Sequence, residues 1–144
     1  MRRLVLAVAL CALAGGCADE ATRDDAPKRQ HERNPPSFGF IDIPTKDATV
    51  DPTVRVSGWA CDESGVKSVR IYFDDELMLS VPLASVRPDV ERVYPRCASA
   101  DHIHGFESII DAGAHAGYTN IRAEVIDGKG GMTPLPSVSV KIRE

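Results

Sequence analysis

The sequence predicts an all-β fold for residues 38–144, an antiparallel sandwich of two sheets with about seven strands. Val, Ile and Phe alternate with polar residues through this region, and a period of two is typical of strands with one buried face. Turn residues recur about every ten positions, as they do between the short strands of a sandwich or a barrel. No segment shows a convincing helical period, and the length and strand count favour an immunoglobulin-like sandwich.

The first three strands are expected at residues 38–43, 53–61 and 66–73. Pro44 ends the first, because proline cannot donate a ladder hydrogen bond. In the second, Trp59 and Cys61 fall on the opposite parity from the preceding valines, which predicts a β-bulge in the Gly-Trp-Ala stretch around Trp59. Residues 62–65, Asp-Glu-Ser-Gly, have the composition of a turn. The third strand has the clearest alternation of apolar and polar residues.

The other strands are expected at residues 77–83, 105–111, 118–127 and 138–142. Asp74 and Asp75 turn the chain into the first of these, and a glycine-rich loop at residues 127–131 precedes the last. Residues 84–104 show no clean period. The side chains expected in the core are Ile41, Val54, Val56, Trp59, Val69, Ile71, Phe73, Phe106, Ile110, Ile121, Val125, Val138 and Val140.

The first 17 residues have the parts of an export signal. Arg2 and Arg3 precede an uncharged apolar run at residues 4–13, and small residues follow up to Cys17. The run is too short to cross a bilayer, which needs about 20 residues. Residues 13–17, Leu-Ala-Gly-Gly-Cys, resemble the lipobox of bacterial lipoproteins. The resemblance implies cleavage before Cys17 and acylation of that residue with diacylglycerol and a palmitate-type chain; the alternative is an ordinary secretory signal with a chance cysteine.

The chain is thus divided into a lipoprotein signal peptide (residues 1–16), a lipidated linker (17–37) and the β-sandwich domain (38–144). The linker is polar and contains several prolines, so we expect a flexible, disordered stalk that holds the domain off the membrane. Two or three acyl chains anchor stably, at about 0.8 kcal/mol per buried CH2. Ala18 stands where an aspartate would, by resemblance to known sorting signals, indicate inner-membrane retention. The expected location is therefore the bacterial cell envelope, with the outer membrane or cell surface favoured.

Charge and cysteine content agree with export. Loss of residues 1–16 leaves 15 Lys and Arg against 21 Asp and Glu, a net charge of −6, which disfavours nucleic acid or an anionic membrane surface as a partner. Of the four cysteines, Cys11 leaves with the signal and Cys17 takes the lipid. Cys61 and Cys97 remain, and in an oxidising compartment we expect a disulfide between them. It would close a loop of about 35 residues, which is worth about 4 kcal/mol.

Several short motifs occur in order along the domain. The most specific are Gly58-Trp59-Ala60, Arg87-Pro88-Asp89-Val90 and Gly105-Phe106. Together they resemble the bacterial immunoglobulin-like (Big-type) modules of exported proteins, a resemblance that spans residues 39–142. It implies a β-sandwich, extracytoplasmic use and no catalytic residues. The cysteine pair departs from the interstrand bridge of antibody domains, and this bridge would pin residues 84–104 to the second strand.

The long segment 84–104 and its end supply the candidates for ligand contact. These are Arg87, Asp89, Tyr94, His102 and His104. For Arg87 and Asp89 the alternative is a structural role, because Pro88 restricts the backbone and the two charges can order the loop. His31 and His115 are expected to be single, solvent-exposed histidines.

No metal or other cofactor is expected. A zinc site could be assembled from Cys61, Cys97, Asp101, His102 and His104. Against zinc, an oxidised cysteine pair cannot ligate, and the two histidines alternate like exposed strand residues. Carboxylates that could gather calcium near loops are Asp62, Asp74, Asp75, Asp89 and Asp127. Their spacing reproduces no calcium-binding loop, so they are interpreted as turn-forming residues.

The predicted function is non-enzymatic, since no serine lies in a nucleophile elbow. We expect a lipid-anchored envelope or surface protein that presents an immunoglobulin-like binding or adhesion module to a protein or glycan. The alternative is a structural accessory subunit of a larger envelope complex. A third hypothesis, a zinc- or thiol-dependent enzyme, requires Cys97 to be free.

Overall fold

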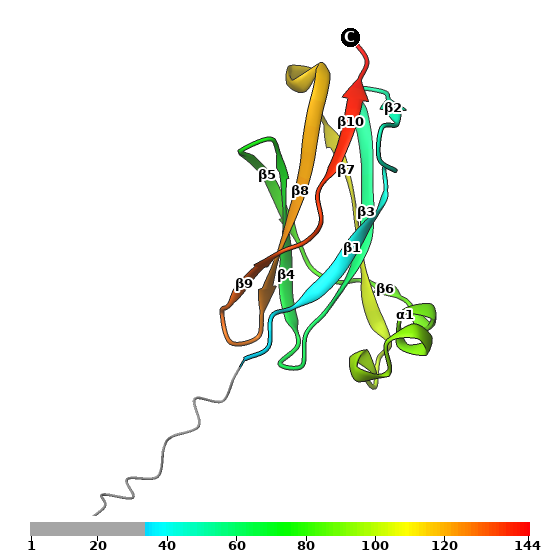
Figure 1. Ribbon diagram of the computed structural model, residues 1–144, viewed down its shortest axis with the longest axis vertical. Helices are drawn as coiled ribbons and strands as arrows, with labels where there is room; N and C mark the ends of the chain where they lie inside the picture. The colour runs from blue at the N-terminus through cyan, green and yellow to red at the C-terminus, as the bar shows by residue number, and fades with distance from the viewer. Residues whose placement is uncertain (1–33) are drawn as a thin grey trace, which may run out of the picture. The chain divides into compact units, whose positions relative to one another are not determined.

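Two β-sheets pack face to face in residues 34–144, the part of the chain that the computed structural model describes (Figure 1). The predicted all-β sandwich is therefore confirmed. The predicted signal peptide, the lipidation site Cys17, most of the linker and His31 lie outside the described residues. In residues 34–144, no helix has the length and hydropathy of a transmembrane span.

The first sheet has four strands in the spatial order β1-β3-β7-β6. Their bounds are β1 Phe38–Ile43, β3 Thr53–Cys61, β7 Ile103–Asp111 and β6 Ser85–Val86. The second sheet has the order β2-β10-β8-β4-β5, with β9 paired to β8. Its strands are β2 Thr49–Val50, β10 Val138–Ile142, β8 Gly117–Asp127, β4 Val66–Phe73, β5 Glu76–Val81 and β9 Met132–Pro134. All pairs are antiparallel except β2 with β10.

All seven predicted strands are present, with small shifts at four ends. β5 runs over Glu76–Val81 rather than 77–83, β7 begins at Ile103 rather than at residue 105, and β8 begins at Gly117 rather than at residue 118. All the predicted core residues are buried. Every one except Trp59 belongs to the main core cluster between the two sheets.

The segment without a clean period contains short helices. Within residues 84–104 these are α1 Pro88–Val93 and η1 Pro95–Cys97. A third short helix, η2 Gly113–His115, follows β7 outside this segment. Pro88 lies in the first turn of α1, where its missing N–H costs no hydrogen bond. A helix of six residues is less than two turns, which is too short to produce a recognisable period.

The predicted bulge at Gly58-Trp59-Ala60 is wrong. β3 pairs with β7 without a register shift up to Trp59, and the irregularity lies in β1, between Ile41 and Ile43. The parity changes for a different reason: both faces of β3 are buried at its end. Ala60 faces the main core, whereas Trp59 and Cys61 lie in a second cluster with residues of α1 and η1.

Candidate functional site

The second cluster lies at the lower end of the sandwich in Figure 1, where α1 and η1 pack on the outer face of the first sheet. Trp59 is 6 % exposed, and its ring centroid lies 5.7 Å from that of Phe38 and 5.2 Å from that of Tyr94. The Phe38 and Trp59 rings meet edge to face, a favourable aromatic arrangement. Tyr94, a predicted ligand contact, is thus a packing residue of this cluster.

The predicted disulfide between Cys61 and Cys97 is confirmed. It joins the end of β3 to η1 across a sequence separation of 36, with the two Cα atoms 5.6 Å apart. Both cysteines are buried. Because each sulfur is bonded to the other, neither is available as a zinc-binding thiolate or a thiol nucleophile.

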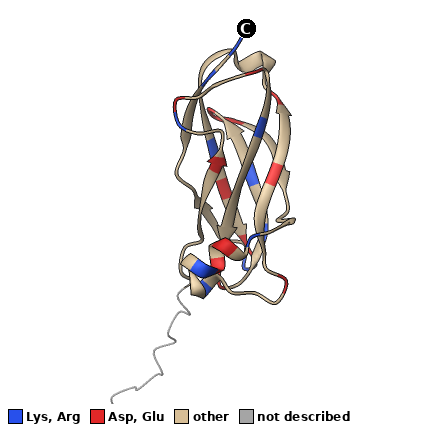
Figure 2. Cartoon of the chain, turned by 90° about the vertical axis from the view of Figure 1, so that its right-hand side faces the viewer, with Lys and Arg blue, Asp and Glu red and all other residues tan. Residues whose placement is uncertain are grey.

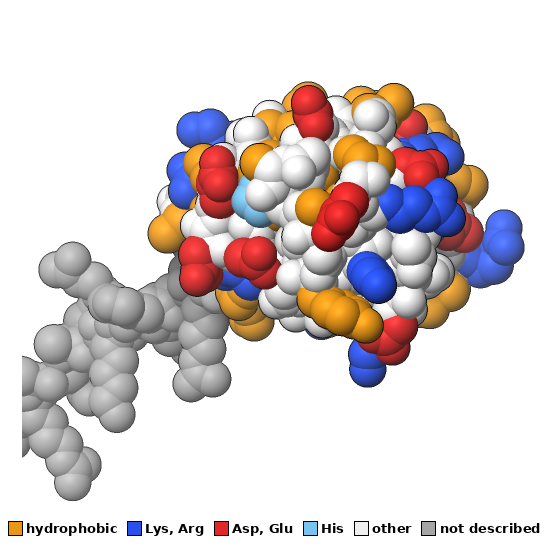
Figure 3. Space-filling model, turned by 90° about the horizontal axis from the view of Figure 1, so that it is seen from above, with side chains coloured by type: hydrophobic (Ala, Val, Ile, Leu, Met, Phe, Trp, Pro, Cys, Tyr) orange, Lys and Arg blue, Asp and Glu red, His pale blue; other side chains and the backbone are white. Residues whose placement is uncertain are grey.

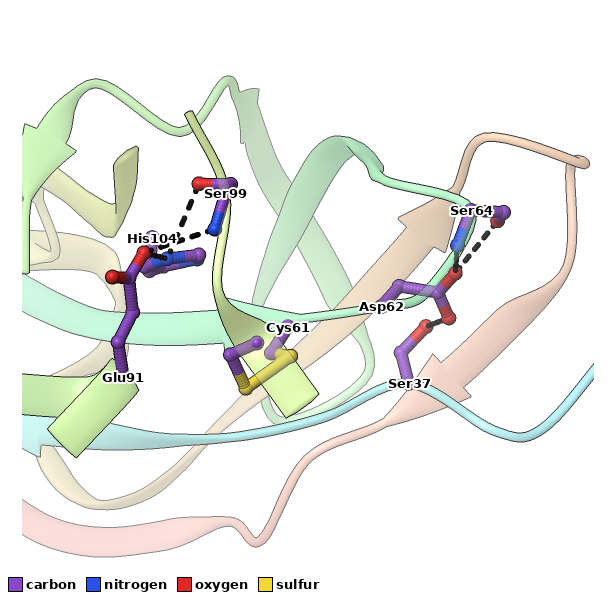
Figure 4. Close-up of a disulfide and its surroundings, with 8 residues drawn as sticks. Ser37, Cys61, Asp62, Ser64, Glu91, Ser99 and His104 are labelled. Atoms are coloured by element: carbon purple, nitrogen blue, oxygen red, sulfur yellow. Dashed lines mark hydrogen bonds and ion pairs between the residues drawn. A yellow bond between two sulfur atoms is a disulfide. The ribbon is translucent and has the colours of Figure 1, made fainter. Parts of the chain in front are cut away.

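Beside the disulfide, Glu91 of α1 contacts residues at the start of β7 (Figure 4). Its carboxylate lies 2.7 Å from His102 Nδ1 and 2.7 Å from His104 Nε2, and it accepts a 3.1 Å hydrogen bond from the Ser99 N–H. The hydrogen bond from His104 is the main cause that lowers the pKa of Glu91 to about 2; those from His102 and Ser99 add to it, against the opposing effect of burial.

The exposed-strand interpretation of the two histidines is wrong. The His104 side chain is only 6 % exposed, because it lies under α1 against Glu91. His102 is exposed but precedes β7 and has a positive φ of 55°. The structure thus brings both histidines together through Glu91, a residue that sequence reasoning missed.

This cluster has a serine, a histidine and a carboxylate but not the geometry of a catalytic triad. Ser99 Oγ lies 3.5 Å from His104 Nε2, the same nitrogen that contacts Glu91, so the ring cannot relay a proton between them. The Ser99 hydroxyl instead donates to Asp101 Oδ1 at 2.8 Å. The hydrogen bond from the Ile103 N–H is the main cause that lowers the pKa of Asp101, and the hydrogen bond from Ser99 adds to it.

Arg87 and Asp89 pair with each other. The guanidinium donates from Nε and Nη2 to the Asp89 carboxylate, and Nη1 donates to Asp42 Oδ2 of β1 at 2.8 Å. The hydrogen bonds to Asp89 raise the pKa of Arg87, and they lower the pKa of Asp89 to about 2. Charges of both signs lie close together on the helical segment (Figure 2). The contacts support the loop-ordering role for this pair.

An open cavity of about 420 Å³ lies beside the disulfide, and His104 is among its lining residues. It is bordered by the β3–β4 turn, the residues after β5, and the chain from η1 to β7. The lining residues include Glu63, Lys67, Arg96, Asp101 and His104. Only His104 was among the predicted contacts. The predicted disulfide could have pointed to two further lining residues, because Glu63 and Arg96 lie within two positions of Cys61 and Cys97 in the sequence.

Two of the acidic loop residues, Asp127 and Asp62, act as turn formers. Asp127, which is 2 % exposed, accepts hydrogen bonds from the Lys129 and Gly131 N–H groups and from Asn34 Nδ2, at 2.7–2.8 Å. Burial raises the pKa of Asp127, but these hydrogen bonds outweigh it and the net shift is downward. Asp62 likewise accepts from Ser64 and Ser37 (Figure 4). In residues 34–144, no three His, Cys, Asp or Glu side chains are grouped to hold a metal ion.

The prediction that His115 is solvent-exposed is wrong. Its side chain is 12 % exposed and its ring lies 5.5 Å from that of Phe73, edge to face. η2 holds it at the upper end of the sandwich, where acidic, basic and apolar side chains are interspersed (Figure 3). Its side chain is therefore largely, though not completely, buried.

The comparisons with known proteins bear on the fold. No protein-family model and no curated protein matches the sequence. A solved structure of Clostridium thermocellum CbhA fibronectin(III)-like modules is similar, with a TM-score of 0.50 and 17 % sequence identity. The similarity covers 74 % of this chain and 96 % of that one. The chain therefore has a fibronectin III-like β-sandwich fold.

Proposed function

We propose that this protein is a non-enzymatic, lipid-anchored protein of the bacterial envelope, on the outer membrane or cell surface, whose immunoglobulin-like domain is a binding or adhesion module. The observation that carries the binding role is the open cavity of about 420 Å³ beside the disulfide. The volume is in the range of small-ligand sites, which is about 300–1,000 Å³. Fibronectin III-like modules are typically non-catalytic, which supports binding over catalysis.

The position of the cavity supports presentation near the lipid. The chain enters the sandwich at the same end as the turn between β3 and β4 (Figure 1), whose residues line the cavity. Ser37 Oγ donates to Asp62 Oδ2 at 2.7 Å, which ties the entering chain to the β3–β4 turn that borders the cavity. A linker attached to Cys17 would therefore join the domain at its ligand-binding end.

The lipid anchor is tested by mass spectrometry of the protein purified from membranes. We expect a mature N-terminus at Cys17 that carries diacylglycerol and a further acyl chain. The Cys17→Ser variant should lose the acyl mass and leave the membrane fraction, whereas Cys61→Ala should keep both. An unmodified Cys17 in membranes would contradict the proposal.

An accessory-subunit role has its own supporting observation. Four large apolar residues on the strands of the first sheet are exposed: Phe40 by 45 %, Ile43 by 40 %, Val86 by 60 % and Ile109 by 67 %. Such residues are typical of protein interfaces when they form one patch. Crosslinking in intact cells distinguishes the two roles: one stoichiometric protein partner indicates an accessory subunit.

A further inference from the structure

We propose that the cavity beside the Cys61–Cys97 bridge binds a short zwitterionic peptide, a proposal that rests on the binding role above. The cavity is built by three segments distant in sequence. Its lining includes Ala60 and Lys67 from β3 and β4, Leu83 from the chain after β5, and Ile103 from β7. The disulfide holds two of these segments together, so the site is preformed.

His104 is held at the cavity by Glu91. Its Nε2 donates to the Glu91 carboxylate, which only accepts, at 2.7 Å, and its side chain is among the residues that line the cavity. Within residues 34–144, Nδ1 has no hydrogen-bond partner, and no fully buried side-chain nitrogen or oxygen lacks one. Nδ1 is therefore reached by solvent and is available for a hydrogen bond to a ligand of the cavity that His104 lines.

Two cations at the cavity are available to an anionic group. Lys67 is the extra residue of a β-bulge between Val66 and Ser68, a feature that re-aims a side chain. Arg96 is held with its guanidinium 3.9 Å from the centroid of the Phe38 ring. In the described part of the chain, neither cation forms a salt bridge.

Two carboxylates at the same cavity are available to an ammonium group. Glu63 is exposed and, among the described residues, forms no ion pair. Asp101 uses Oδ1 for Ser99 and Ile103, which leaves Oδ2 for a ligand. A ligand of one charge would meet repulsion from two of these four groups, whereas a zwitterion satisfies both signs.

The lining also distinguishes a peptide from a glycan. Val66, Pro82, Leu83 and Ile103 give the cavity an apolar wall that fits small aliphatic side chains. None of the lining residues is Phe, Tyr or Trp, so a sugar ring finds no aromatic face to stack on. The chemistry of the site therefore favours a small peptide with free termini.

The test is calorimetric titration of the full chain in detergent with trialanine. We expect trialanine to bind, and the N-acetylated, C-amidated form to bind at least about tenfold more weakly. Lys67→Met and Glu63→Gln should each raise Kd by about tenfold, while the control variants Lys46→Met and Glu144→Gln leave it unchanged. In protein labelled with 15N-histidine, trialanine should shift the His104 ring signals and leave those of His115 unmoved.

Equal affinity for the capped peptide, or equal effects of Lys67→Met and Lys46→Met, would overturn the proposal. Binding of a neutral trisaccharide in place of trialanine would overturn the ligand class but retain the binding module. An unshifted His104 would overturn the cavity as the site. The state of Cys17 is measured separately, so loss of the lipid anchor is distinguishable from each of these outcomes.

Discussion

Removing the Cys61–Cys97 bridge should lower the stability of the whole sandwich. The bridge closes a loop with a sequence separation of 36, for which the chain-entropy relation gives about 4 kcal/mol at 25 °C. For a domain of about 110 residues, 1 kcal/mol corresponds to about 4 °C in Tm, so the Cys61→Ala/Cys97→Ala variant should melt about 15 °C below the parent. Alanine is the replacement chosen, because it adds no polar group to the buried cluster.

Two probes report on different parts of this domain. Trp59 is the single tryptophan of the chain and lies in the second cluster, so its fluorescence follows the contact of α1 and η1 with β3. Circular dichroism follows the two sheets. If the loop constrains the unfolded chain, both probes should shift together in urea, and the m value should rise because the unfolded chain without the bridge exposes more surface. The parent in reducing agent should behave like the double variant.

The reasoning is refuted by either of two results. A double variant whose Tm lies within about 3 °C of the parent would mean that the closed loop contributes little to stability. A fluorescence transition that precedes the circular-dichroism transition would mean that the bridge holds only the covering segment, and that the sandwich folds independently of it.

Three further changes have definite expected outcomes. Trp59→Ala should cost about 3–5 kcal/mol in urea unfolding, because it empties the second cluster; a loss below about 1 kcal/mol would contradict that packing role. Gly58→Ala should lower the free energy of unfolding by at least about 1–3 kcal/mol, since a Cβ at this position would collide with the backbone oxygen of Phe40. Ala116→Gly is used for comparison, because the exposed Gly65 has a positive φ and cannot serve as a control. Glu91→Gln should remove a pH dependence: the folded-state pKa of about 2 lies below the ordinary 4.5, so the carboxylate stabilises the fold above pH 4.5 and loses that effect as the pH falls toward 2. The difference between parent and variant in unfolding free energy should therefore shrink across this window, and a constant difference would contradict the assignment.

Strands that were long enough to repeat their pattern were predicted correctly. Val69, Ile71 and Phe73 alternate over β4, and all three are fully buried. β2, β6 and β9 have two or three residues each, so they carry no period. Their strand conformation depends on the neighbouring strands to which they hydrogen-bond.

The error at Trp59 shows how a local pattern misleads. The odd parity of Trp59 and Cys61 is compatible with a bulge or with burial on both faces. The structure has the second arrangement, because Val90 and Cys97 cover that face. Those residues lie about 30 or more positions further along the chain, beyond any window in which periodicity operates.

The sequence by itself determined the strand pattern, the core and the pairing of Cys61 with Cys97, because alternation and cysteine content are properties of the chain that need no knowledge of its neighbours. The tertiary structure alone decided that Glu91 holds His104 and that Lys67 and Arg96 share a cavity. These groups come from separate segments, and their distances depend on strand register and on the packing of α1 and η1. Residue type sets what a side chain can bind, whereas packing sets which side chains meet.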